Sequence, residues 1–209
     1  MAHISSEELN TWGESFEAKQ PQEVLAAVIE RYAPKIVLAC SFGAEDVVLV
    51  DMVHRINPSV PLFYLDTEFL FPETYATRDR VIERYGLQQQ QVMQVKSLLT
   101  PEQQVAQHGE ALWARQPDQC CELRKVEPLT RVLKGFDAWI TGIRRDQSPA
   151  RANAKLIEWD QKFSWRKSIH LRSGPGRMSG PTSVSMKCPT MNCMTATIPV
   201  SAAPTARAR

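Results

Sequence analysis

The sequence predicts an α/β protein with a doubly wound, mostly parallel sheet. Two observations predict this class. Short continuous apolar runs, typical of strands buried on both faces of a sheet, alternate with segments whose apolar residues recur at helical spacing. The chain also has 209 residues, of which 43% are hydrophobic, enough to bury the core of one domain. Ligands of such folds bind beyond the carboxyl ends of the strands, so function is expected at the strand-to-helix turns.

The individual elements follow from local patterns. Apolar runs predict strands over residues 35–40, 60–67, 91–96 and 137–143. Helical spacing predicts helices over residues 20–33, 46–56, 72–86, 100–109 and 118–135. The third of these helices has the clearest limits, because Pro72 suits the first turn of a helix and Gly86 suits its end. Helices therefore separate the successive strands, as the crossovers of a parallel sheet require.

Charge divides the chain into two parts. All 23 acidic residues lie at or before Asp160, whereas residues 161–209 contain Lys and Arg but no acid. The basic residues of this tail are scattered among Pro, Ser and Thr, without the clustering or interleaved aromatic residues of a nucleic-acid surface. We therefore expect no nucleic-acid partner.

Cysteine usage and hydropathy bear on location. No apolar run reaches membrane-spanning length, and the N-terminus lacks the pattern of a signal peptide, so we expect a cytoplasmic protein that does not bind membranes. Thiols stay reduced in the cytosol, and the odd number of 5 cysteines argues against a disulfide framework. Metal binding, catalysis and simple packing remain as roles for them.

The turn after the first predicted strand, SFGAED, is the first candidate site. Ser41 and Gly43 lie where a strand passes into a helix, and the backbone N–H groups at such a turn can bind an anion. Glycine lets a phosphate or sulfate approach the backbone, and the serine hydroxyl adds a donor. The alternative is a tight turn with a capping serine.

Two further segments end at the same predicted edge of the sheet. Asp66 and Thr67 follow the second strand, where Asp66 could accept from a ribose or an amine or could cap its own loop. Arg144 and Arg145 follow the fourth strand, and arginine forks bind phosphate or sulfate oxygens in pairs. A solvated basic loop is the alternative for the arginines.

Two cysteines stand side by side in the predicted helix over residues 118–135. Cys120 and Cys121 point about 100° apart on a regular helix, so they can serve one metal centre only if the helix is locally distorted and further ligands come from elsewhere. Packing of two small side chains is the alternative.

Four segments in order resemble one known family. SFGAED, LDTEFLFPETY, QCCELRKVEPL and WITGIRRDQSPAR are similar to motifs of the adenylylsulfate and phosphoadenylylsulfate (APS and PAPS) reductases of assimilatory sulfate reduction. The resemblance runs from about Ile36 to Trp159. It implies an adenine-nucleotide α-hydrolase-like fold and the thioredoxin-dependent reduction of the sulfonucleotide to sulfite and AMP, or to adenosine 3′,5′-bisphosphate.

The resemblance also implies roles for particular residues. Adjacent cysteines mark the iron–sulfur type of the family, so Cys120 and Cys121 would be two of the four ligands of a [4Fe–4S] cluster, and Lys125 would lie between cluster and substrate. The residues expected to bind the substrate are Ser41, Phe42, Gly43, Asp66, Thr67, Arg144 and Arg145. Thioredoxin is the expected partner, and the sequence leaves open whether the protein is a homo-oligomer.

The C-terminal part departs from the family pattern. The family nucleophile is a cysteine in a segment like ECGLH, with a C-x-x-C pair upstream, and neither motif is present. Cys188 and Cys193 are separated by four residues, so the ligand set of the cluster is incomplete. We expect a reductase domain over residues 1–162 and an aberrant, disordered basic tail over 163–209. A shifted reading frame near Phe163 would account for the tail and would leave this chain inactive.

Two other functions stay open from the sequence. One is an ATP pyrophosphatase or adenylating enzyme on the same fold, whose loop normally reads S-G-G-x-D-S, whereas Phe42 stands here at the first glycine. The other is a non-catalytic nucleotide-binding remnant.

Overall fold

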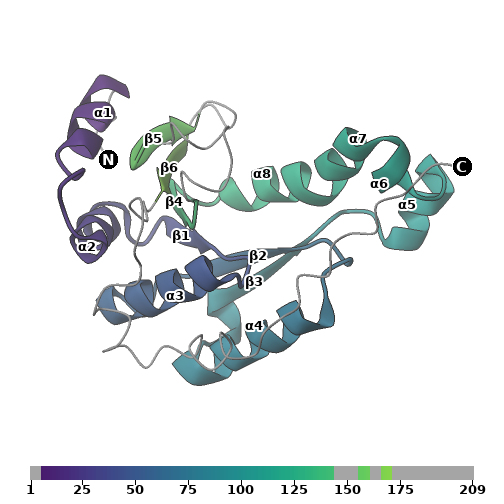
Figure 1. Ribbon diagram of the computed structural model, residues 1–209, viewed down its shortest axis with the longest axis horizontal. Helices are drawn as coiled ribbons and strands as arrows, with labels where there is room; N and C mark the ends of the chain where they lie inside the picture. Colours follow the sequence, from purple (N-terminus) through teal and green to yellow (C-terminus); the bar gives the residue numbers. More distant parts are fainter. Residues whose placement is uncertain (1–5, 144–154, 161–165, 171–209) are drawn as a thin grey trace, which may run out of the picture.

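The sheet is the centre of the protein. The structure, a computed structural model, describes residues 6–143, 155–160 and 166–170. These residues form a six-stranded sheet of order β3-β2-β1-β4-β6-β5. Its strands are β1 (Ile36–Ala39), β2 (Leu62–Asp66), β3 (Val92–Lys96), β4 (Ala138–Thr141), β5 (Ile157–Asp160) and β6 (Arg166–His170). β5 runs antiparallel to β6, and the other pairs are parallel. The predicted doubly wound, mostly parallel α/β fold is confirmed (Figure 1).

Helices cover both faces of the sheet. The longer helices are α1 (Ser6–Glu14), α2 (Pro21–Tyr32), α3 (Ala44–Ile56), α4 (Pro72–Tyr85), α5 (Pro101–His108) and α8 (Glu127–Leu133). Ile36 and Leu38 of β1 pack in the core beneath α2 and α3, whereas Val37 packs with Leu133 of α8 on the opposite face. This alternation explains why the strand reads as a continuous apolar run. As predicted, α4 begins at Pro72 and ends before Gly86, which is left-handed at φ 58°.

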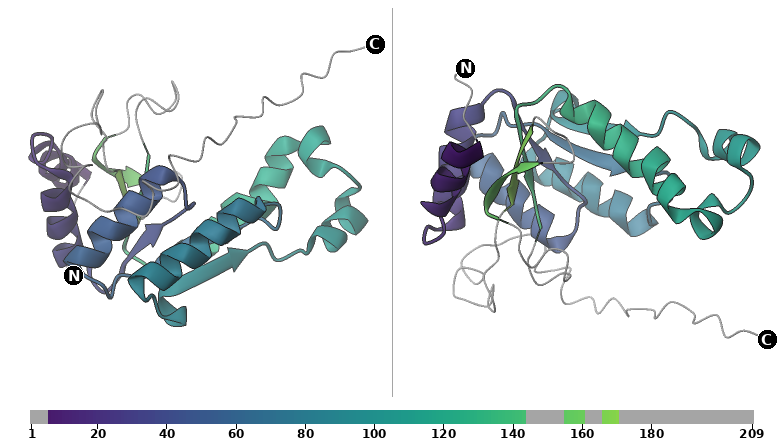
Figure 2. Two further views of the ribbon diagram at one scale, coloured as in Figure 1. Left: turned by 60° about the horizontal axis from the view of Figure 1, so that its bottom comes forward. Right: turned by 90° about the horizontal axis from the view of Figure 1, so that it is seen from above.

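The strand order brings three turns to one edge of the sheet. β1 lies between β2 and β4, with Leu38 opposite both Leu62 and Ile140. Because these strands are parallel, the turns that follow them meet at the same edge. The short helices α6 (Leu112–Arg115) and α7 (Pro117–Cys121) lie beyond the carboxyl end of β3 with α5, far from α1 (Figure 2).

Some elements were not predicted. They are α1, α6, β5 and β6. α1 packs on β5 at Gly13, where an added Cβ would lie 3.1 Å from the carbonyl oxygen of Ile157. β6 lies within residues 163–209, the tail that was expected to be disordered, and Arg166–His170 pairs with β4. β6 forms through backbone pairing with β4, a strand distant in the sequence, and no local sequence pattern indicates such pairing. Within the described residues, no helix is both long and apolar enough to span a bilayer.

Candidate functional site

The turn between β1 and α3 has an unusual backbone. Phe42, and not Gly43, takes the left-handed conformation, with φ 60° against −68° for Gly43. The Phe42 side chain is buried, and its ring lies 5.3 Å from that of Tyr64, edge to face. A non-glycine residue in this region is strained by about 1–3 kcal/mol and persists only where its surroundings hold it. Aromatic packing on β2 therefore fixes the turn that was predicted to bind an anion.

The carboxylate of Asp46 stabilises this turn by accepting hydrogen bonds from it. Its Oδ2 accepts from the Ser41 N–H at 2.5 Å and from the Ser41 hydroxyl at 2.6 Å. A third donor is the Gly142 N–H, which follows β4. Burial raises the pKa of Asp46, and the hydrogen bonds from Ser41 and Gly142 oppose this shift only in part. The donors of Ser41 expected to bind the substrate are thus held by an internal carboxylate, a role of Asp46 that the sequence analysis missed.

Asp66 organises the turn after β2. Its Oδ1 accepts from the Glu68 N–H at 2.9 Å and from the Tyr75 hydroxyl at 2.7 Å, and its Oδ2 accepts from Gln94. Burial opposes ionisation, but these hydrogen bonds together with Lys96 lower the pKa of Asp66. The same bond to Asp66 raises the pKa of Tyr75 to about 12. Asp66 therefore caps its own loop, the alternative that the sequence left open, and its predicted contact with the substrate stays a prediction.

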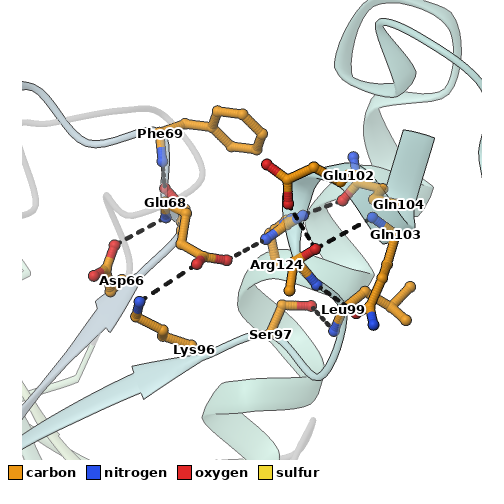
Figure 3. Close-up of polar contacts among 12 residues, drawn as sticks. Asp66, Glu68, Phe69, Lys96, Ser97, Leu99, Glu102, Gln103, Gln104 and Arg124 are labelled. Carbon is orange, nitrogen blue, oxygen red and sulfur yellow. Dashed lines mark hydrogen bonds and ion pairs between the residues drawn. The ribbon is translucent and has the colours of Figure 1, made fainter. Parts of the chain in front are cut away.

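Glu68 and Arg124 join this turn to the cysteine-bearing segment. Arg124 is 2% exposed, and its Nη1 lies 2.9 Å from Oε2 of Glu68. Its Nε donates to Gln104 of α5 at 2.7 Å (Figure 3). Lys96 lies 3.4 Å from the other Glu68 oxygen, so one carboxylate bridges two cations. Neither Glu68 nor Arg124 was predicted, because their partners lie 56 residues apart in the chain.

The helix around the cysteine pair is distorted. The predicted single helix is divided into α7, which ends at Cys121, a π-helical turn η2 (Glu122–Val126), and α8. Cys120 is half-buried and Cys121 is exposed. Lys125, also exposed, lies in the π turn. Such π turns are rare in helices, and those that occur frequently lie at functional sites. Two adjacent cysteines could bind one metal centre only if the helix were distorted. The π turn that begins at Glu122, directly after Cys121, is a distortion of this kind.

The thiols present fit an iron–sulfur cluster only in part. Four thiolates are needed, and the described residues contain three free cysteines, of which the third, Cys40, is buried at the end of β1. Burial raises the pKa of the Cys40 thiol, so it stays protonated and structural. Within the described part of the chain, no group of three or more His, Cys, Asp or Glu side chains could hold a metal. Cys188 and Cys193 lie outside the described residues.

The remaining predicted site residues are placed as follows. Thr67 follows Asp66, and its hydroxyl oxygen lies 3.4 Å from the Phe69 N–H. Arg144 and Arg145 lie outside the described residues, which stop at Ile143, so their predicted contacts stay predictions.

This fold and this edge define an α/β protein of the adenine-nucleotide α-hydrolase-like class. The family model described as "Phosphoadenosine phosphosulfate reductase domain" matches residues 35–187. The chain belongs to this family, and the predicted resemblance is confirmed. The match runs beyond Trp159, the limit of the resemblance seen in the sequence.

Curated relatives agree with the family. The chain is 44% identical over 155 residues to adenosine 5′-phosphosulfate reductase of Halalkalibacterium halodurans, covering 74% of this chain and 66% of the relative. It is 44% identical over 154 residues to adenosine 5′-phosphosulfate reductase 1 of Bacillus subtilis, covering 73% and 65%. A phosphoadenosine 5′-phosphosulfate reductase of Gloeobacter violaceus is 44% identical over 142 residues, covering 68% and 58%. The chain thus spans two thirds or less of the length of these relatives.

A solved structure supports the fold independently. The crystal structure of phosphoadenylyl-sulfate reductase from Candida auris, in complex with phosphate, superposes with a TM-score of 0.73 at 25% identity. The likeness covers 93% of this chain and 94% of the other.

Proposed function

We propose that this chain binds adenylylsulfate or phosphoadenylylsulfate and is the sulfonucleotide-binding part of a thioredoxin-dependent reductase that forms sulfite. One observation carries the proposal: in a chain of this family, the turns after β1 and β2 lie on adjacent parallel strands, with Ala39 opposite Phe63. The phosphate complex of the Candida auris relative supports an oxyanion site in this fold. Adenylylsulfate is the first substrate to test, because most of the similar relatives are named for it.

The chemistry of the family sets what the site must do. A cysteine thiolate attacks the sulfur of the bound sulfonate and displaces the nucleotide, leaving an S-sulfonated cysteine. A dithiol then reduces this adduct, releasing sulfite, restoring the thiol and becoming a disulfide. A thiolate that approaches an anion is repelled, so cationic groups must offset the charge of the sulfonate and of the departing phosphate. We assign this role to Lys125, Arg144 and Arg145.

The turn after β1 contributes through its backbone. The first N–H groups of α3 have no acceptor within the helix, and the positive end of the helix dipole favours an anion there. Asp46 holds Ser41 in place from behind this turn. We propose that the phosphate of the nucleotide binds at this end of α3, where the backbone is already in position.

Cys120 and Cys121 are proposed as two ligands of a [4Fe–4S] cluster. The π turn that follows them supports this role. When bound, the cluster would place a strong local electrostatic field near the substrate. The described residues supply only part of the four-thiolate ligand set of such a cluster. Thioredoxin as the dithiol and a cytoplasmic location complete the proposal.

Calorimetry tests nucleotide binding, and a sulfite assay tests the reaction. The purified chain should release or absorb heat with adenylylsulfate and with AMP and should bind ATP more weakly. No heat with adenylylsulfate or AMP would refute the proposal. Sulfite release from adenylylsulfate with thioredoxin and its reductase would show a complete reductase, whereas binding without sulfite would identify a nucleotide-binding remnant. Release of pyrophosphate from ATP would favour the adenylating alternative.

A further inference from the structure

The ion pair of Glu68 and Arg124 differs from the other ion pairs of the described residues in the burial of its arginine. The Arg124 side chain is 2% exposed, whereas Arg55, which pairs with Asp51 at 2.8 Å, is 64% exposed. Burying a guanidinium is costly unless its partners are well placed. Arg124 has the carboxylate of Glu68, the amide oxygen of Gln104 and the ring of Phe69, 5.2 Å from its guanidinium carbon. Its Nη2 is buried without a hydrogen-bond partner among the described residues.

Glu68 is held in a strained conformation at the other end of the pair. Its φ is 62°, in the left-handed region, where a glutamate is uncommon. Its N–H donates to Asp66, and its carboxylate bridges Arg124 and Lys96. Strain of this kind persists only where surrounding contacts fix it. The buried arginine therefore helps set the backbone of the turn that contains Asp66 and Thr67.

Arg124 belongs to the π turn that follows the cysteine pair. Cys120 and Cys121 end α7, and Arg124 and Lys125 lie in η2. Figure 3 shows the Arg124 side chain reaching from this segment to Glu68, with Lys96 on the far side of the carboxylate. One side chain thus connects the turn after β2 to the segment that carries the thiols.

We propose that Arg124 is a positioning residue whose ion pair with Glu68 couples occupancy of the nucleotide site to the accessibility of the Cys120 and Cys121 thiols. The inference rests on the proposed function, since it takes the turn after β2 as part of the nucleotide site. Coupling of two sites is reciprocal, so nucleotide changes the accessibility of the thiols, and a change in the thiol segment changes nucleotide affinity.

The test uses AMP as the ligand and thiol alkylation as the second readout. In the parent chain, treated with a chelator to remove bound iron, saturating AMP should change the rate of iodoacetamide labelling of Cys120 and Cys121 by about fivefold. In Arg124→Gln, AMP should bind about tenfold more weakly and should no longer change the labelling rate. This variant should fold, because Glu68 keeps Lys96 as its partner at 3.4 Å.

Matched variants separate positioning from stability. Glu68→Gln should reproduce both effects, and Arg124→Gln combined with Glu68→Gln should be no worse than either single change, because the two residues act as a unit. Arg124→Lys should restore part of the affinity, since an ammonium can reach Glu68 but lacks the fork that also reaches Gln104. Arg55→Gln, which removes the exposed arginine from Asp51, should leave both readouts unchanged.

Three outcomes decide the inference. If Arg124→Gln and Glu68→Gln lower the melting temperature but leave AMP affinity within twofold, the pair is only structural and the inference is wrong. If AMP does not change thiol labelling in the parent chain, coupling is absent and the inference is also wrong. If the parent chain binds neither AMP nor adenylylsulfate, the proposed function fails, and the inference fails with it.

Discussion

The turns after β1 and β2 each contain a buried aspartate that accepts hydrogen bonds from the turn, yet the pKa values of the two carboxyl groups are shifted in opposite directions. Asp46 is 8% exposed and Asp66 is 2% exposed, and each accepts three hydrogen bonds from its surroundings. The pKa of Asp46 is raised because burial outweighs its donors. The pKa of Asp66 is lowered because its donors, with Lys96 nearby, outweigh burial. Although each carboxylate accepts three hydrogen bonds, these bonds outweigh burial at Asp66 and do not outweigh it at Asp46.

The largest expected effect comes from removing the charge of Asp66. Asp66→Asn should lower the free energy of unfolding by about 3 kcal/mol, because hydrogen bonds to a charged acceptor are strong and the new amide replaces one of the two accepting oxygens with an NH2 group, which faces the donor of either Tyr75 or Gln94. Asp46→Asn should cost only about 1 kcal/mol, since the charge of Asp46 is itself disfavoured. Urea unfolding of both variants at pH 7 measures the difference. Equal costs would contradict the contrast between the two turns.

A steric change at Gly142 tests how the Asp46 carboxylate is held in the turn after β1. An added Cβ would overlap Oδ1 of Asp46, so Gly142→Ala must displace the carboxylate from Ser41. We expect a loss of about 2 kcal/mol in unfolding free energy, as for other overpacked sites, together with weaker AMP binding. Gly135→Ala is the control, because the Cβ would meet its nearest atom at 3.8 Å. Equal stability of the two variants would show that Asp46 is not held as described.

Removing one donor from Asp66 should have a smaller effect. Tyr75→Phe deletes the hydroxyl that donates at 2.7 Å and should cost about 1 kcal/mol. The same bond predicts that Tyr75 ionises with a pKa of about 12, which ultraviolet titration of tyrosinate measures. Asp66→Asn should return this pKa toward 10, the ordinary value for tyrosine. A tyrosine that titrates identically in both proteins would argue against the bond.

The smallest effect is a difference in the pH dependence of stability. The folded pKa of Asp66 is below its ordinary value of 3.8, so its contribution is present above that pH and is lost as the pH falls through the folded pKa. The folded pKa of Asp46 is above 3.8, so its contribution is present below that pH and is lost as the pH rises through the folded pKa. The cost of Asp66→Asn should therefore grow from pH 3 to pH 7, while that of Asp46→Asn should shrink. Unfolding free energies measured across this pH range test both trends. If the costs of the two substitutions changed in the same direction with pH, the opposite pKa shifts of Asp46 and Asp66 would be refuted.

Much of the fold could be predicted from the sequence because its signals are local. Apolar runs located β1 to β4, and Pro72 with Gly86 located the limits of α4. The π turn after Cys121 was not located, because the sequence indicated a distorted helix only on the condition that both cysteines bind one metal centre. β5 and β6 are short strands whose order depends on pairing with each other and with β4, so local patterns did not reveal them.

The sequence by itself determined the α/β class, the turns after the strands and the family, because apolar spacing and short motifs are carried by neighbouring residues. Only the tertiary structure decided which side chains complete those turns. Asp46 meets Gly142 and Glu68 meets Arg124 because parallel strands and their crossovers bring distant segments to one edge of the sheet. A buried charge is stable only where such partners converge, and their convergence depends on the fold.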